Sequence, residues 1–168
     1  MNTLVSIIMG SLSDWKTMEK AAKQLEEFEI PFEINALSAH RTPEAVENFA
    51  KNAEKKGIKV IIAGAGMAAH LGGVIASYTN LPVIGVPICA SLNGLDALLA
   101  IVQMPPCIPV ATVAIDGAQN AAVLAAQILS LSDEKIKNKL NKFKINLKEK
   151  VELANKELTE IKFNFKTN

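Results

Sequence analysis

Charged side chains are nearly absent from the middle of this 168-residue chain. Between residues 60 and 132 the only formal charges are Asp96 and Asp116. Glycine, proline, asparagine and glutamine interrupt this segment before a run of about 18 apolar residues can form, so we expect no membrane span and no membrane partner. The segment is instead expected to be hidden by self-association.

Cysteine is scarce as well. Cys89 and Cys107 have the spacing of neither a metal site nor a redox pair, and we expect them to be packing residues in a reducing compartment. The sequence starts in a strand pattern, without the basic, apolar and cleavage regions of a secretory signal. Both observations predict a cytoplasmic location.

Several catalytic motifs are missing too. The chain has no Gly-x-Ser-x-Gly elbow, no Walker lysine loop, no His-Glu-x-x-His and no dinucleotide fingerprint. Residues 133–168 hold ten lysines and six acidic residues, but these alternate and carry no aromatic stacking pattern. We therefore expect a solvated helix there and no nucleic-acid binding.

The order of the segments predicts the fold. Short β-branched runs alternate with helical patterns, which is typical of a three-layer α/β domain with a doubly wound parallel sheet of about five strands, as in flavodoxin-like proteins. The chain is long enough for one such domain, residues 1–168. The expected strands are residues 4–9, 32–37, 59–63, 83–86 and 110–115, and the expected helices are 14–28, 43–55, 69–78, 94–102 and 118–131.

A long amphipathic helix is expected at the end of the chain, from Asp133 to about Lys162. Some thirty helical residues would span about 45 Å, which is more than a domain of this size can easily cover. We therefore expect residues 133–168 to be a helical extension that packs on a neighbouring subunit. A helix that lies wholly on its own domain, or bends into two, is the alternative.

The candidate site lies in the loops that follow the expected strands, because ligands of such sheets bind beyond the carboxyl ends of the strands. The loop Gly10 to Asp14 pairs a glycine turn with hydroxyls at a helix start, where backbone N–H groups favour an anion. Ser11-x-x-Asp14 is also a capping-box pattern. Asp14 would repel a phosphate, so in a nucleotide site it is expected to meet sugar hydroxyls, whereas Arg41 can hold phosphate oxygens.

His40 and His70 are the only histidines. His40 precedes Arg41 in a loop and, with partial burial, suits general acid-base chemistry. Thr42 is expected to cap the helix that starts at Pro43. His70, beside alanine and leucine, is explained more readily by a structural role than by a catalytic one.

These segments resemble class I of the PurE family over about residues 3–131. The resemblance rests on six motifs in order: Gly10-Ser11-x-Ser13-Asp14, Ser38-Ala39-His40-Arg41-Thr42-Pro43, Ala68-Ala69-His70-Leu71, Pro82-Val83-Ile84-Gly85-Val86-Pro87, Asn93-Gly94-Leu95-Asp96 and Gln103-Met104-Pro105. It implies an N5-carboxyaminoimidazole ribonucleotide mutase of purine biosynthesis, an isomerase that moves CO2 from N5 to C4 without cofactor or metal. It further implies a homo-octamer that works after an ATP-dependent carboxyaminoimidazole ribonucleotide synthetase.

The resemblance also implies residue roles. His40 would carry the proton, with His70 as a second catalytic residue. The implied substrate contacts are phosphate at Ser11, Ser13 and Arg41, ribose at Asp14, and the ring and CO2 at Ser38, Ala39, Ala65, Gly66, His70 and Leu71.

Three residues depart from the family pattern: Met67, Gly72 and Cys107 stand where Gly, Pro and Gly are expected. The segment of residues 87–94 is also one residue shorter than in that pattern. The alternatives are a direct aminoimidazole ribonucleotide carboxylase of class II, a carboxylase that makes a pyridinium-type cofactor, and a non-catalytic flavodoxin-like nucleotide-binding module. The last would be an FMN carrier or a receiver domain, although no aromatic lies in the site loops and no acidic cluster follows the first strand.

Overall fold

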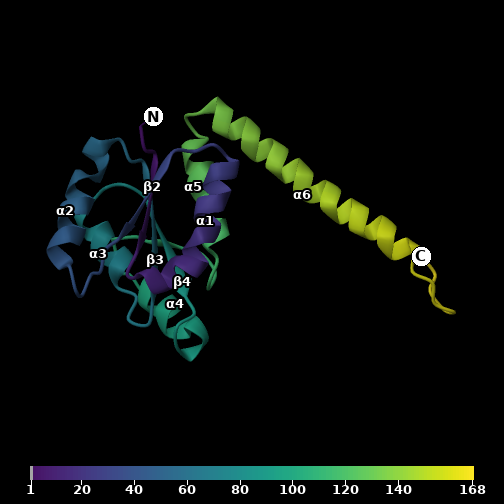
Figure 1. Ribbon diagram of the computed structural model, residues 1–168, viewed down its shortest axis with the longest axis horizontal. Coiled ribbons are helices and arrows are strands. Elements are labelled where there is room, and N and C mark those ends of the chain that lie inside the picture. Colours follow the sequence, from purple (N-terminus) through teal and green to yellow (C-terminus); the bar gives the residue numbers. More distant parts are fainter. Residues whose placement is uncertain (1) are drawn as a thin grey trace.

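Five parallel strands form the middle layer of the structure, a computed structural model that describes residues 2–168 (Figure 1). The sheet has the order β2-β1-β3-β4-β5. Its strands are β1 (Val5–Met9), β2 (Phe32–Ala36), β3 (Val60–Gly66), β4 (Val83–Ile88) and β5 (Ala111–Thr112). This confirms the flavodoxin-like α/β fold that the alternation of segments predicts, with a reversal of strand order between β1 and β3.

Helices cover both faces of the sheet. They are α1 (Trp15–Glu27), α2 (Pro43–Ala53), α3 (Leu71–Tyr78), α4 (Leu95–Val102), α5 (Ala118–Leu129) and α6 (Glu134–Glu160). Buried residues of α1 and α5 pack on one face, and those of α2, α3 and α4 pack on the other. Because both faces are covered, the central strands β1, β3 and β4 have no exposed residue.

Two strands, β3 and β5, end three residues away from the expected positions. β3 continues to Gly66, where it pairs with Ile88 of β4, because small residues that suggest a loop also fit a buried strand. β5 is confined to Ala111 and Thr112, which pair only with β4 at the edge of the sheet. The strand predicted over 110–115 is therefore mostly a loop.

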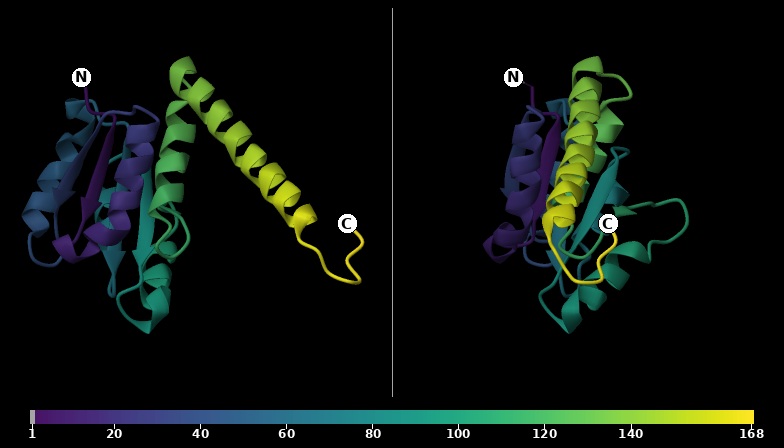
Figure 2. Two further views of the ribbon diagram at one scale, coloured as in Figure 1. Left: turned by 45° about the vertical axis from the view of Figure 1, so that its right-hand side comes forward. Right: turned by 90° about the vertical axis from the view of Figure 1, so that its right-hand side faces the viewer.

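The long helix α6 leaves the body of the domain, as Figure 1 and the left view of Figure 2 show. Its first turns are anchored: Ile136 and Leu140 are buried, and the rings of Phe143 and Phe28 are 5.3 Å apart. Past Phe143 the helix is exposed, and it is about 40 Å long in all. The expected apolar face is thus only partly used by its own domain.

The two cysteines do not fulfil their expected role. Cys89 and Cys107 are both exposed, so they are not packing residues of this chain, because both lie in loops outside the two cores. Among the described residues, no helix is both long enough and apolar enough to cross a membrane.

Candidate active site

A pocket of about 540 Å³ opens at the carboxyl edge of the sheet. Loops that follow β1, β2, β3 and β4 all contribute to its lining. In a sheet of this order the loops after β1 and β3 separate to opposite faces, which leaves a crevice between them. The pocket therefore lies where the topology favours ligand binding.

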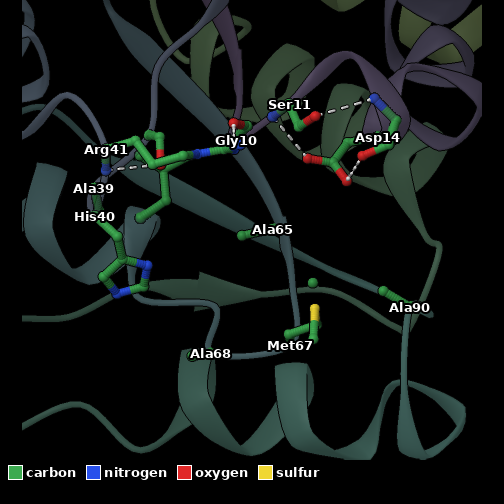
Figure 3. Close-up of a pocket in the computed structure, with 14 residues that line it drawn as sticks. Gly10, Ser11, Asp14, Ala39, His40, Arg41, Ala65, Met67, Ala68 and Ala90 are labelled. Carbon is green, nitrogen blue, oxygen red and sulfur yellow. Dashed lines mark hydrogen bonds between the residues drawn. The ribbon is translucent and has the colours of Figure 1, made fainter.

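The loop after β1 forms the polar side of the pocket (Figure 3). Ser11 and Asp14 make the expected capping box: the Ser11 backbone N–H donates to Asp14 Oδ2 at 3.1 Å, and the Ser13 N–H donates to Ser11 Oγ at 3.4 Å. Burial raises the pKa of the Asp14 carboxyl above its ordinary value, although hydrogen bonds from Ser11 and Ser13 oppose the rise. The loop thus holds a carboxylate close to a cluster of hydroxyl and N–H donors.

Arg41 links the loop after β2 to the glycine turn. Its Nη2 donates to the Gly10 carbonyl at 2.6 Å, and its Nε donates to Ser38 Oγ at 3.2 Å. The guanidinium is planar with five N–H donors, so others remain for an anion. This arrangement fixes the cation at the mouth of the pocket.

Thr42 occupies the N-cap position of α2 but does not cap it with its side chain. Its Oγ1 donates to the Ser38 carbonyl at 3.1 Å and accepts from the Ser38 N–H at 3.0 Å. Thr42 is therefore at the predicted N-cap position, but the predicted capping hydrogen bond is wrong. The hydroxyl closes the turn from Ser38 to Thr42 instead. That turn holds His40 and Arg41 on the pocket side.

The two histidines contact each other. Nε2 of His40 lies 2.9 Å from Nδ1 of His70, and the ring planes meet at 77°. Both side chains are exposed, so the partial burial expected for His40 is not present in this chain. A contact of this length requires a proton on one of the two nitrogens and a lone pair on the other.

The remaining lining is small and mostly apolar. Ala65, Gly66, Ala68 and Ala90 surround the inner part of the pocket, and a Cβ on Gly66 would lie 2.9 Å from the Ala90 Cβ. Glycine at 66 therefore lets the loop after β4 approach β3 closely. A flat ring fits such a surface better than a bulky ligand does.

The structure gathers the residues singled out from the sequence. Ten of them line the pocket, namely Ser11, Ser13, Asp14, Ser38, Ala39, His40, Arg41, Ala65, Gly66 and Leu71. His70 is placed beside them by its contact with His40. The lining residues that the sequence did not single out as contacts are Gly10, Met67, Ala68 and Ala90. Ala68 and Ala90 have no functional group that would mark them as site residues in a sequence. Ala90 does, however, lie in the loop after β4, which was expected at the carboxyl edge of the sheet.

No three His, Cys, Asp or Glu side chains within residues 2–168 are grouped so that they could hold a metal ion. Independently of this, the imidazoles of His40 and His70 can transfer a proton, and Arg41 and the serine loop can bind an anion.

Comparison with known proteins agrees with this site. The AIR carboxylase family profile matches residues 4–150. The chain is 60% identical over 159 residues to the N5-carboxyaminoimidazole ribonucleotide mutase of Pyrococcus horikoshii, which covers 94% of this chain and 90% of that relative. It is 61% identical over 145 residues to the same-named protein of Pyrococcus abyssi, covering 86% and 83%.

A solved structure is similar as well. The crystal structure of Treponema denticola PurE superposes with a TM-score of 0.85 at 33% identity, covering 92% of this chain and 98% of that one. The matched region includes every loop that lines the pocket. The chain therefore belongs to the AIR carboxylase, or PurE, family.

Proposed function

We propose that this protein is an N5-carboxyaminoimidazole ribonucleotide mutase. The reaction moves a carboxylate from the exocyclic nitrogen of a ribonucleotide to carbon C4 of its imidazole ring. The observation that carries the proposal is one pocket that combines an imidazole pair, a fixed guanidinium and a serine-rich glycine turn. Two relatives of that name, which are 60% and 61% identical to this chain over most of both chains, support it.

The substrate would bind with its phosphate at Ser11, Ser13 and Arg41, because these supply hydroxyls and a cation at the pocket mouth. Asp14 would accept hydrogen bonds from the ribose. The ring and the reacting carboxylate would then lie against the rest of the site, namely Ser38, Ala39, Ala65, Gly66, His70 and Leu71.

His40 would move one proton through the reaction. It protonates the carbamate nitrogen, the C–N bond breaks and neutral CO2 leaves. The electron-rich C4 attacks the CO2 carbon to form the C–C bond. His40 then takes the C4 proton, which restores the aromatic ring and returns the imidazole to its starting state. Because the ring supplies the nucleophile, the side chains need only carry a proton and hold the pieces.

His70 would act beside His40 as a second catalytic residue. Its Nδ1 engages His40 Nε2, and the contacts of residues 2–168 leave His40 Nδ1 without a hydrogen-bond partner. In this geometry Nδ1 of His40 is the nitrogen that remains available to the substrate. His70 therefore fixes which way the His40 ring faces.

The direct test follows the ultraviolet change between the carbamate and the C4 carboxylate, without ATP, metal or added bicarbonate. His40→Asn is expected to lower turnover by about 10² to 10⁴-fold, the usual contribution of a general acid-base group. Binding should survive, and Trp15, the only tryptophan and next to Asp14, offers a fluorescence signal for it. Full activity in His40→Asn would contradict the assigned role.

A second candidate is direct carboxylation of aminoimidazole ribonucleotide by CO2. The family name AIR carboxylase favours this activity. Turnover of aminoimidazole ribonucleotide with CO2, combined with no turnover of the carbamate, would establish the carboxylase and exclude the mutase.

We also propose that residues 133–168 pack on a neighbouring copy in a homo-octamer. Exposed apolar residues recur along the free part of α6, at Leu147, Val151 and Leu158, and Ile161 follows directly after its end. Native mass spectrometry is expected to give eight times the 18.0 kDa subunit. Serine at Leu147, Val151 and Leu158 should dissociate the assembly, whereas serine at Glu149 and Lys156, on the opposite side of the helix, should not. An unchanged mass in the triple variant would refute this role of α6.

The carbamate would be supplied by an ATP-dependent carboxyaminoimidazole ribonucleotide synthetase in the cytoplasm. Making a carbamate from bicarbonate requires an activated carboxyl group, which ATP can provide. A mixture of that synthetase, this protein, ATP, bicarbonate and aminoimidazole ribonucleotide is expected to give the C4 carboxylate. Product formation that does not require the synthetase would argue against this coupling.

A further inference from the structure

Met67 stands out among the residues that line the pocket. It follows β3 directly, the residue is 61% exposed, and its backbone is left-handed with φ of 56°. Figure 3 shows Met67 with its sulfur-bearing end turned toward the space between Ala65 and Ala90. A large, exposed apolar side chain therefore reaches the opening of a pocket whose other exposed lining residues are polar or small.

The backbone requirement at this position is clear. The Ala69 N–H donates to the Met67 carbonyl at 2.9 Å, and the His70 N–H donates to the Ala68 carbonyl at 2.8 Å. These two tight turns carry the chain from β3 into α3 and place His70 against His40. The left-handed residue at 67 is part of that path.

The backbone turn after β3 does not explain why residue 67 carries a large side chain. A left-handed conformation costs an L-residue about 1 to 2 kcal/mol, and glycine would avoid the cost. Within this chain the exposed methionine gains little packing in return. Strain of this kind at a site is a reason to look for a use of the side chain.

Met67 can cover the opening of the pocket. Leu71 is the other large apolar residue in the lining, and it is 2% exposed, so it cannot move over the opening. Methionine has three rotatable side-chain bonds and adapts to irregular surfaces. In the proposed reaction the migrating group is neutral CO2, which a cation such as Arg41 attracts much less than it attracts an anion, so an apolar cover helps to retain it.

We propose that Met67 folds over the bound imidazole ring and retains the released CO2 until C4 captures it. This inference rests on the proposed mutase function. After the C–N bond breaks, CO2 has two fates. It forms the C–C bond at C4 with loss of the C4 proton to His40, or it escapes and reacts with water to give bicarbonate and a proton, leaving aminoimidazole ribonucleotide behind. Met67 sets the ratio of capture to escape.

The experiment supplies the carbamate in the presence of ¹³C-bicarbonate and carbonic anhydrase. Mass spectrometry then measures the ¹³C content of the C4 carboxylate and the fraction of aminoimidazole ribonucleotide formed. Met67→Ala and Met67→Gly are expected to raise escape about ten-fold, the rate change that matches loss of one good apolar contact. Met67→Leu keeps the bulk and is expected to keep escape low.

Leu92→Ala is the matched control. Leu92 is also left-handed, is 76% exposed and follows β4 at the same edge of the sheet, but it does not line the pocket. Escape is expected to be unchanged in this variant. Equal escape in the wild type, Met67→Ala and Met67→Gly would overturn the inference, as would a rise in Leu92→Ala equal to that in Met67→Ala.

The variants also separate the side chain from the backbone. Met67→Gly removes the strain, whereas Met67→Ala keeps it, so thermal stability should differ between the two while escape does not. If CO2 escape instead differed between Met67→Gly and Met67→Ala in step with their thermal stability, the inference would be wrong. If the wild type does not convert the carbamate at all, the mutase proposal itself fails, which is a different result from conversion with unaltered escape.

Discussion

His40 and His70 are thirty positions apart in sequence, yet Nε2 of one lies 2.9 Å from Nδ1 of the other. The turn after β2 brings the first ring to the pocket, and the left-handed turn at Met67 brings the second. The contact joins the two loops on either side of the β1–β3 reversal.

The first prediction tests this contact. His70→Phe is expected to lower kcat about ten-fold with little change in KM, because one hydrogen bond that orients His40 is lost. His70→Asn, whose amide can occupy the place of Nδ1, is expected to recover part of the loss. Steady-state kinetics of both variants measure the split between kcat and KM.

A double variant supplies the control for that prediction. If His70 acts through His40, adding His70→Phe to His40→Asn should cause almost no further loss. Additive losses would mean that His70 works independently of His40.

The second prediction concerns Arg41, the only arginine in the chain. Arg41→Ala is expected to raise KM about 10 to 100-fold, the effect of losing hydrogen bonds to a charged phosphate. Arg41→Lys should recover little, because the ammonium cannot donate to Gly10, Ser38 and phosphate together. Lys51→Ala, a cation outside the pocket, is the control for general charge effects.

Chemical modification offers an independent check of Arg41. An arginine reagent such as phenylglyoxal can modify one residue only, and substrate should protect it. Inactivation that substrate does not slow would contradict its place at the phosphate.

The third prediction is a pH dependence of stability. Burial raises the pKa of Asp14, so the folded state binds this proton more tightly than the unfolded state. The contribution of Asp14 to stability therefore falls as pH rises from the unfolded pKa through the higher folded pKa. Asp14→Asn removes the titration, so its thermal midpoint relative to the wild type should rise with pH across that window.

Glu29 provides a control of opposite sign. The hydrogen bond and charge of Lys139, 2.7 Å away, lower the pKa of Glu29. Its contribution is present above the unfolded pKa and is lost as pH falls through the lower folded pKa. Glu29→Gln should thus be less stable than the wild type near neutral pH and equal to it in acid. The same trend in both variants would contradict these assignments.

The fourth prediction compares two glycines of the core. A Cβ on Gly85 would lie 2.4 Å from Cγ2 of Ile101, a buried β-branched residue that has little room to move. A Cβ on Gly64 would meet the Sδ of Met18, whose unbranched chain can adjust. Gly85→Ala is therefore expected to lose about 1 to 3 kcal/mol of stability, and Gly64→Ala less. Thermal denaturation measures both.

Adding Ile101→Ala to Gly85→Ala supplies a test of the cause. If the clash is responsible, the double variant should lose less than the sum of the single losses. Strict additivity would point to another origin.

Much of the fold could be predicted because its signals are local. The alternation of apolar segments predicts the helices to within a few residues, and the carboxyl-end rule predicts which loops meet. The short β5 could not be predicted, because Val113 and Ile115 have strand-forming side chains, yet the pairing with β4 ends at Thr112. Pairing at a sheet edge depends on the neighbours and not on the strand itself.

The site was predictable where its residues carry chemistry, as His40, Arg41 and Asp14 do. The contact between the histidines was not, because it depends on a left-handed backbone at Met67, a residue that favours no such conformation. The capping hydrogen bond predicted for Thr42 is wrong for a similar reason. Its hydroxyl can bond either to the first turn of α2 or to the backbone of Ser38, and in the structure it bonds to Ser38.

The strand order has a consequence for how the chain is made. Helix α1 packs against α5, and β1 needs β3 as well as β2 for its pairing. At cellular rates of synthesis, roughly ten seconds separate the emergence of α1 from that of α5. During that time Met18 and Leu25 of the nascent chain lack the part of their native cover that α5 supplies, so chaperones that act at the ribosome should meet this protein through its first helix.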